Sequence, residues 1–298
     1  MRNSLSILLP TYNCRCVELV ERLHGQCRAV ASRVCGFCYE IVVADDCSTD
    51  RRLVGQNGAI ERLEHVRYLK LPGNIGRSAV RNLLAREARG EWLVFIDGDL
   101  SVGRADFVEK YVESEGDIVV GGVEIGGDPK VWCDNLRYQY EKRCEGAHSV
   151  EGRSRMAGRE FRTTNFLVAR GVMSRHPFDE RFRHYGYEDV LFGKSLCAGG
   201  YAIRHIDNPV LLDDFEPNAV YVGKTEEACR TLMEFSSQLR GYSSLLVAVL
   251  SIRRMHMQGM FAFAFRLFGK AVRRNLCGRK PCVRLFNIYR LLYCCAIH

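Results

Sequence analysis

The stretch that decides the fold is EWLVFIDGD, residues 91–99. Trp92–Ile96 is an uninterrupted apolar run of the length typical of a strand that is buried on both faces. Asp97 and Asp99 follow at once, with only Gly98 between them. Ligands of an open parallel sheet bind beyond the carboxyl ends of its strands. The pattern therefore predicts two carboxylates at a ligand-binding edge, although an isolated Asp-x-Asp also occurs as a turn or a helix cap.

Two more predicted strands end in polar residues. The strand at 5–9 leads into PTYN (residues 10–13), and the strand at 40–44 leads into DDCSTD (residues 45–50). Apolar residues at helical spacing separate the strands and predict helices at 17–34, 51–64, 76–89 and 104–115. Further strands are expected at 66–71 and 117–121. Strands that alternate with helices predict an α/β fold with a parallel sheet.

The second half of the chain is less regular. We expect helices at 130–145 and 188–198, a Gly- and Arg-rich loop at 146–162, a strand at 164–169 and an extended stretch at 201–212. From about residue 225 the pattern is helical to the end. We therefore predict a catalytic domain over residues 1–223 and a helical extension over residues 224–298.

The strand ends carry five carboxylates, which repel one another unless a positive group binds among them. Hard oxygen ligands suit Mg²⁺ or Mn²⁺, and such cations commonly bind through one or two carboxylates and the phosphates of a substrate. The pattern thus predicts a divalent cation and a phosphorylated substrate, most simply a nucleoside diphosphate. The alternative for residues 46–50 is a cap on the next helix.

An ordered set of motifs resembles family 2 glycosyltransferases of the GT-A fold. The matching pieces are SILLPTYN (6–13), VVADDCSTD (42–50), NIG (74–76), AVRN (79–82), FIDGD (95–99) and GYED (186–189). The chain is most similar to bacterial members that build surface polysaccharides. The resemblance implies a Rossmann-like, mostly parallel sheet flanked by helices. It also implies an inverting, metal-dependent enzyme that moves a sugar from a nucleotide sugar, most simply a UDP-sugar, to a hydroxyl of a glycan or lipid-linked acceptor.

The resemblance also implies roles for single residues. Asp189 matches the catalytic base, with Glu188 beside it, and a carboxylate at a helix start can take a proton from an acceptor hydroxyl. Asp99 and Asp97 match the metal ligands. The donor nucleotide is expected at Pro10, Thr11, Tyr12, Asp45, Asp46, Asn74, Arg81 and Asp97. The acceptor or sugar pocket is expected at Thr164 and Asn165. The acidic first turn of a helix, favoured by the helix dipole, is the alternative for Glu188 and Asp189.

One position departs from the family pattern. Many relatives carry a metal-binding His shortly after Asn-Pro-Val, and Leu212 stands there in this chain. Asp213, Asp214 or water could replace that ligand, or the chain could be a weakened member that binds nucleotide sugar and scaffolds a polysaccharide assembly complex. Arginines in the expected loop could close over a diphosphate or lie in solvent: Arg153, Arg155, Arg159 and Arg162. A nucleotidyltransferase is disfavoured because residues 8–16 contain no Gly.

The net charge of +8 is unevenly distributed. Residues 224–298 contain 13 Lys and Arg against 3 Asp and Glu, a balance of +10, and no acidic residue follows Glu234. Residues 241–252 and 255–265 are uncharged but too short to span a bilayer. Two interpretations remain open: amphipathic helices on an anionic membrane, or a helical pair packed on the catalytic domain with its charges in water. Nucleic acid is not expected, because no nucleic-acid motif accompanies the charge.

The 14 cysteines do not follow a metal-site spacing. Cys35 and Cys38 form a C-x-x-C with no second pair nearby, so we interpret them as structural. The N-terminus lacks a leader pattern, and no run of about 20 uncharged apolar residues occurs. We therefore expect reduced thiols and a cytoplasmic enzyme, held peripherally at the inner face of the plasma membrane if its C-terminal helices bind lipid.

Overall fold

The computed structural model describes residues 1–156 and 158–297, so Ala157 of the predicted loop and His298 of the predicted extension lie outside it. The chain divides into two compact units. The sheet unit comprises Met1–Glu124, His148–Arg183 and Phe192–Leu212. The helical unit comprises Ile125–Ala147, His184–Leu191 and Asp213–His298. The expected division at residue 223 stays a prediction, and helix α10 (Asn218–Glu234) runs across that position.

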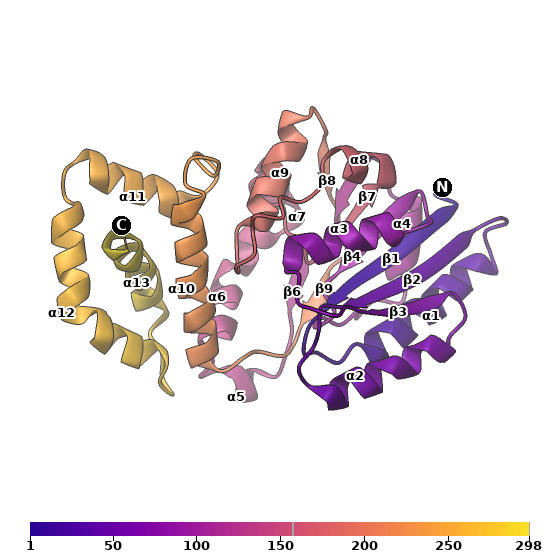
Figure 1. Ribbon diagram of the computed structural model, residues 1–298, viewed down its shortest axis with the longest axis horizontal. Coiled ribbons are helices and arrows are strands. Elements are labelled where there is room, and N and C mark those ends of the chain that lie inside the picture. Colours follow the sequence, from indigo (N-terminus) through magenta and orange to yellow (C-terminus); the bar gives the residue numbers. More distant parts are fainter. Residues whose placement is uncertain (157, 298) are drawn as a thin grey trace. The chain divides into compact units, whose positions relative to one another are not determined.

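A seven-stranded sheet forms the centre of the sheet unit (Figure 1). Its spatial order is β3-β2-β1-β4-β7-β5-β8. The strands are β1 (Ser4–Thr11), β2 (Cys38–Asp45), β3 (Val66–Lys70), β4 (Trp92–Ile96), β5 (Ile118–Val120), β7 (Asn165–Ala169) and β8 (Ile203–His205). Only β7 runs antiparallel to its neighbours, so the predicted mostly parallel sheet is confirmed. Two short strands, β6 (Val123–Ile125) and β9 (Val210–Leu212), form a second sheet.

Helices cover both faces of the large sheet, which explains why its strands are continuously apolar. Helix α3 (Arg77–Glu87) contacts β1, β2 and α8 on one face, and α1 (Val17–Ala31) contacts β2 and α4 on the other. Leu8 and Phe95 belong to the core under α3, together with Val80 and Leu84. The remaining elements that lie wholly in the sheet unit are α2 (Arg51–Asn57), the 3₁₀ helix η1 (Gly58–Arg62), α4 (Phe107–Glu113), α7 (Val150–Arg155) and α8 (Arg170–Arg175).

The helical unit has a core of its own. Its helices are α5 (Pro129–Trp132), α6 (Leu136–Cys144), α10, α11 (Ser244–Arg254), α12 (Gln258–Leu276) and α13 (Val283–Ala296). The 3₁₀ helix η2 (Glu145–His148) begins in this unit and ends in the sheet unit. Helix α13 packs against both α12 and α10 (Figure 1). Tyr221, Leu276, Phe286 and Tyr289 are buried in this core. Among the described residues, none of the helices combines the length and the apolar character needed to cross a bilayer.

Candidate active site

The ends of β1 and β2 lie side by side because the two strands pair in parallel register. Thr11 is aligned with Asp45, and both side chains are buried. Asp45 accepts hydrogen bonds from the Tyr68 hydroxyl at 2.5 Å and from the Ser48 backbone N–H at 2.7 Å. Burial, together with the bond to this carboxylate, raises the pKa of Tyr68, which therefore stays a neutral donor. Asp45 is thus held in one orientation at the edge where the nucleotide was predicted.

Asp46 connects this strand end to the loop before α3. Its carboxylate accepts the backbone N–H groups of Ile75 at 2.7 Å and Gly76 at 3.0 Å. The Asn74 side-chain amide donates to the Asp46 carbonyl oxygen at 3.0 Å. Gly76 has a φ of +89°, a conformation that favours glycine. Asp46 and Asn74 therefore fix the loop geometry through contacts within the protein.

An ion pair with a buried arginine anchors the predicted metal-binding turn. The Arg81 guanidinium, 2% exposed, donates to Asp97 at 2.7 Å. Arg81 reaches the turn from α3, and its guanidinium carbon lies 5.7 Å from the centre of the Phe178 ring. A positive charge supplied by the protein therefore already faces Asp97. Repulsion among the carboxylates is weaker than the sequence suggests, because Asp45 and Asp46 also have donors and Asp50 caps α2.

Gly98 is needed where the turn crosses the end of β1. A Cβ atom on Gly98 would lie 2.4 Å from Thr11 Cγ2 and 3.2 Å from the Pro10 carbonyl oxygen. The Gly98 N–H donates to that same carbonyl at 3.2 Å. This close approach brings Asp97 and Asp99 beside Thr11. Tyr12, by contrast, is 49% exposed.

Two further residues lie at this edge: Asn13, which the sequence indicated only as the end of the PTYN motif, and Cys14, which it did not indicate. The Asn13 side chain accepts the backbone N–H groups of Thr49 at 2.8 Å and Asp50 at 3.0 Å, so it joins the loops after β1 and β2. Burial raises the pKa of the Cys14 thiol to about 12, and the charge of Asp99 adds to that shift. The signal for Asn13 was its place in PTYN, and the signal for Cys14 was only its position three residues beyond Thr11.

The two carboxylates that flank Gly98 are a hard oxygen donor pair. One oxygen of Asp97 accepts the Arg81 hydrogen bond, and Asp99 is exposed. Among the residues that the structure describes, no cluster of three or more His, Cys, Asp or Glu side chains is arranged to hold a metal ion. The set therefore fits a Mg²⁺ or Mn²⁺ ion that takes its remaining ligands from a diphosphate and water, rather than an ion caged by protein alone.

The two residues expected in the sugar or acceptor pocket have different environments. The Thr164 carbonyl accepts the Asp97 N–H at 3.2 Å, which brings Thr164 to the metal-binding turn. Asn165 is fully buried: its amide donates to the carbonyls of Gly122 at 2.9 Å and Asn208 at 2.8 Å, and it accepts from Tyr111 at 2.6 Å. Asn165 therefore uses its polar atoms inside the sheet unit.

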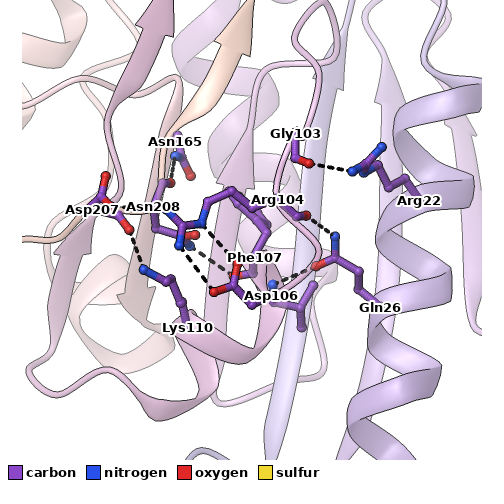
Figure 2. A network of polar contacts seen from close by, with 11 residues as sticks. Arg22, Gln26, Gly103, Arg104, Asp106, Phe107, Lys110, Asn165, Asp207 and Asn208 are labelled. Atoms are coloured by element: carbon purple, nitrogen blue, oxygen red, sulfur yellow. Dashed lines mark hydrogen bonds and ion pairs between the residues drawn. The ribbon is translucent and has the colours of Figure 1, made fainter.

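Figure 2 shows how the segment after the turn is anchored. Arg22 and Gln26 of α1 donate to the carbonyls of Gly103 and Arg104 at 2.6 and 2.7 Å. On the other side, Arg104 forms an ion pair with Asp207 at 3.1 Å, and the next residue, Asn208, bonds to the Phe107 carbonyl at 3.0 Å (Figure 2). These contacts tie residues 103–107 to α1 and to residues 207–208, and the Asn208 carbonyl in turn accepts a hydrogen bond from Asn165.

The predicted catalytic pair begins helix α9 (Glu188–Ala198). The helical unit includes this helix up to Leu191, and the sheet unit includes it from Phe192 onward. Glu188 is buried, whereas Asp189 is partly exposed. The turn before them contains two positive φ values, +98° at Gly186 and +68° at Tyr187. A Cβ on Gly186 would lie 2.8 Å from Ala228 Cβ of α10, so glycine is required for this close approach.

Helix α10 holds that turn in place through two further contacts. Thr231 donates to the Tyr185 carbonyl at 3.1 Å, and His184 lies 3.1 Å from Glu227. Tyr187 is linked by a side-chain hydrogen bond to Ser243, and burial raises the pKa of its phenol. The helical unit therefore sets the local conformation that presents Asp189.

Leu212, which stands where many relatives carry a metal-binding histidine, belongs to the sheet unit. Leu212 is buried in β9, and His205 is buried with its Nδ1 3.0 Å from an Arg153 nitrogen. Asp213 and Asp214 follow in the helical unit, and both are exposed.

The predicted loop at 146–162 is partly helical, in η2 and α7. Arg153 from this segment is buried and donates to the carbonyls of Val120, Gly121 and Ile206. Both interpretations of Arg153, as a solvated side chain and as a diphosphate clamp, are wrong, because its donors are used within the fold. Its pKa is lowered by burial.

Comparison with known proteins gives a family match. The model of the family "Glycosyl transferase family 2" matches residues 6–175, more than half of the chain. A putative teichuronic acid biosynthesis glycosyltransferase, TuaG of Bacillus subtilis, is 30% identical over 111 residues, which are 37% of this chain and 40% of TuaG. The matched stretches span between 20% and 40% of the lengths of the curated relatives.

Two solved structures have a similar fold. The mannosyltransferase PcManGT of Pyrobaculum calidifontis, solved with GDP-Man and Mn²⁺, has a TM-score of 0.56 at 16% identity, over 100% of this chain and 86% of that one. TarS of S. aureus, residues 1–349, solved with UDP-GlcNAc, has a TM-score of 0.50 at 17% identity, over 97% and 90% of the two chains. These similarities confirm the predicted GT-A fold.

Proposed function

Because the chain belongs to glycosyl transferase family 2, we propose that it is an inverting, metal-dependent glycosyltransferase that uses a nucleotide sugar. The observation that carries the proposal is the turn of Asp97, Gly98 and Asp99, which is packed on Thr11 and paired with buried Arg81. A UDP-sugar is the simplest donor, since TarS was solved with UDP-GlcNAc. The acceptor is a hydroxyl of a glycan or a lipid-linked glycan, in line with the polysaccharide biosynthesis named for TuaG.

The donor nucleotide lies, in this proposal, along the carboxyl ends of β1, β2 and β4. Asp45 accepts hydrogen bonds from the base or ribose, and the exposed Tyr12 ring stacks on the base. Asp46 and Asn74 keep the neighbouring loop in place, and Pro10 does the same for the turn through its carbonyl. Arg81 holds Asp97 for the ribose and cation. Preorganised groups of this kind bind without reorganisation when the ligand arrives.

Asp99 and Asp97 would hold a Mn²⁺ or Mg²⁺ ion between the protein and the diphosphate. When bound, that ion stabilises the negative charge on the departing diphosphate. Thr164, next to Asp97, lies on the side proposed for the transferred sugar. Asn165 supports Thr164 from the interior and does not contact the sugar in this proposal.

Asp189 is the proposed general base. It takes the proton from the acceptor hydroxyl as that oxygen forms a bond to the anomeric carbon, and the bond from this carbon to the nucleoside diphosphate breaks on the opposite face. One displacement from the opposite face inverts the anomeric configuration. Glu188, which is more buried, supports the turn.

The test of this function is donor turnover with purified protein. Release of nucleoside diphosphate is measured for a panel of UDP- and GDP-sugars with Mn²⁺, with and without lipid-linked glycan acceptors. We expect turnover for one donor, and Asp189→Asn should lower it by about 10²–10⁴-fold while nucleotide affinity stays unchanged. Asp134→Asn is the matched control, since Asp134 is exposed in the same unit. Full activity in Asp189→Asn would remove that residue from the mechanism.

A second candidate function rests on Leu212. If the missing His leaves the cation too weakly held, the chain binds nucleotide sugar but does not turn it over, and it acts as a scaffold of a polysaccharide assembly complex. Nucleotide binding without any donor hydrolysis, in a folded protein, would favour this scaffold.

A further inference from the structure

The outward face of α12 is apolar and uncovered. Met260, Phe263, Leu267 and Phe268 are 56%, 60%, 57% and 60% exposed. Met260, Phe263 and Leu267 follow one another at intervals of three and four residues, which places them along one side of the helix, and Phe268 flanks that side. Side chains on the opposite side of α12 pack into the core of the helical unit: Phe265, Val272 and Leu276. The helix therefore has one apolar face in its own core and a second one in solvent.

Cationic side chains lie next to this exposed face. Arg266, Lys270 and Arg274 follow one another at intervals of four residues, and all three are exposed. Within residues 1–156 and 158–297, none of the three forms an ion pair with an acidic side chain, whereas Arg273 pairs with Glu226 at 2.8 Å. No acidic residue follows Glu234 in the sequence. The outward face of α12 thus combines large apolar side chains with an uncompensated positive charge.

Apolar and cationic groups on one helical face fit the interfacial region of an anionic bilayer. The turn before α12 adds two exposed methionines, Met255 and Met257. A second copy of the chain is a poorer occupant, because a two-fold interface would bring Arg266, Lys270 and Arg274 against the same cations. A nucleic acid would leave the phenylalanines and Leu267 in water.

We propose that α12 lies flat on an anionic lipid surface. Phe263, Leu267 and Phe268 insert among the upper acyl chains, and Arg266, Lys270 and Arg274 bind the headgroup phosphates. The attraction to each headgroup is electrostatic and falls within a Debye length, so high salt weakens the binding. The residues of this surface belong to the helical unit, whereas the proposed donor residues at the strand ends belong to the sheet unit. Lipid binding through α12 therefore does not depend on the proposed transferase activity.

Sedimentation with lipid vesicles tests the proposal on the full chain. The protein should bind vesicles of phosphatidylcholine mixed with phosphatidylglycerol, and should not bind vesicles of phosphatidylcholine alone. The double variant Phe263→Ser/Leu267→Ser should bind at least about tenfold more weakly, because two inserted side chains are lost. Val131→Ser/Val220→Ser is the matched control, since both valines are exposed on other helices of the same unit.

The contribution of the cations to lipid binding is tested by a variant of α12 and a matched control variant of α2. Arg266→Gln/Lys270→Gln should weaken the binding and reduce its salt dependence, whereas Arg51→Gln/Arg52→Gln, exposed on α2, should do neither. Equal binding to the two kinds of vesicle, or binding that is unchanged in both α12 variants, would overturn the proposal.

A spectroscopic probe distinguishes insertion from mere adsorption. Phe263→Trp should show a blue-shifted fluorescence on mixing with phosphatidylglycerol vesicles, and Val131→Trp should show none. Light scattering after gel filtration tests whether a second copy of the chain occupies this face, because it measures the oligomeric state. A dimer that the Phe263→Ser/Leu267→Ser variant converts to monomer would assign the face to a second copy and overturn the lipid proposal.

Discussion

The carboxyl edge of the sheet and the outward face of α12 are opposites in their chemistry. At the sheet edge, polar groups are buried and bonded to the protein: Arg81 pairs with Asp97, and Tyr68 donates to Asp45. On α12, large apolar side chains are exposed beside exposed cations such as Lys270. Fixed, bonded groups suit a small polar ligand of defined shape. An exposed apolar and cationic face suits a large, soft, anionic surface. The burial and the pairing of the side chains thus distinguish a site for a small polar ligand from a surface for a membrane, whereas their charge alone does not.

The largest expected difference between the regions concerns one arginine in each. Arg81→Met leaves Asp97 without its arginine partner. The variant should lower the free energy of unfolding by about 3 kcal/mol, the low end of the range for a broken buried pair, because Asp97 is partly exposed. Arg266→Met removes an exposed cation that has no acidic partner in the described part of the chain, and should change stability by less than about 0.5 kcal/mol. Urea unfolding of both variants measures the two values. Equal stability of Arg81→Met and the unchanged protein would contradict the preorganised sheet edge.

A glycine in each region gives an effect of opposite sign. Gly98→Ala forces a methyl group against Thr11 and should destabilise the protein by about 1–3 kcal/mol. Gly259, in the first turn of α12, has no neighbouring atom within 4 Å of an added Cβ. Gly259→Ala should therefore stabilise the protein by about 0.5 kcal/mol, because it restricts the unfolded chain. Urea unfolding compares the two glycine variants. Stability changes of the same sign in both would contradict the expected difference between a packed turn and an open helix start.

The smallest expected effect is a difference in reactivity between a thiol at the sheet edge, Cys14, and a thiol of the helical unit, Cys282. The pKa of Cys14 is raised to about 12 by burial and by Asp99, so at pH 8 its thiol stays protonated and unreactive. The pKa of Cys282, at the start of α13, is lowered by the backbone N–H groups of Leu285 and Arg284. Iodoacetamide at pH 8 should thus modify Cys282 well before Cys14, and raising the pH toward 10 should bring their two rates of modification closer together. Mass spectrometry of tryptic peptides gives the order.

Early modification of Cys14 would show that the sheet edge is more open than its burial indicates. Cys38 is a suitable reference, because it is an exposed thiol in the same unit as Cys14.

The sequence was sufficient to predict the GT-A fold and the strand ends of the site. Trp92–Ile96 is apolar because both sheet faces are covered, and that pattern is visible without coordinates. The partner of Asp97 was not predictable, because Arg81 reaches it from a helix whose packing angle no motif encodes. Sequence also assigned Asn165 to a ligand pocket. A polar residue at a strand start looks the same whether it faces a ligand or, as here, Tyr111 and the buried carbonyl of Gly122.

The C-terminal region shows the same limit. The charge pattern predicted amphipathic helices, but it left open which side of each helix is covered. Only the packing of Phe265 and Leu276 into the core shows that Phe263 and Leu267 are left outside. The turn at Gly186 is a further example, because its need for glycine comes from Ala228, which is 42 residues away in sequence.

The central claim is that the turn of Asp97, Gly98 and Asp99 binds a nucleoside diphosphate together with a divalent cation. Thermal unfolding with UDP, GDP, CDP or dTDP, each with and without Mn²⁺, tests it most directly, since a ligand of the native state raises the melting temperature. We predict a rise with one nucleotide that requires Mn²⁺ and is lost in Asp99→Asn but kept in the surface control Glu61→Gln. No rise with any nucleotide, or a rise that Asp99→Asn retains in full, would contradict the claim.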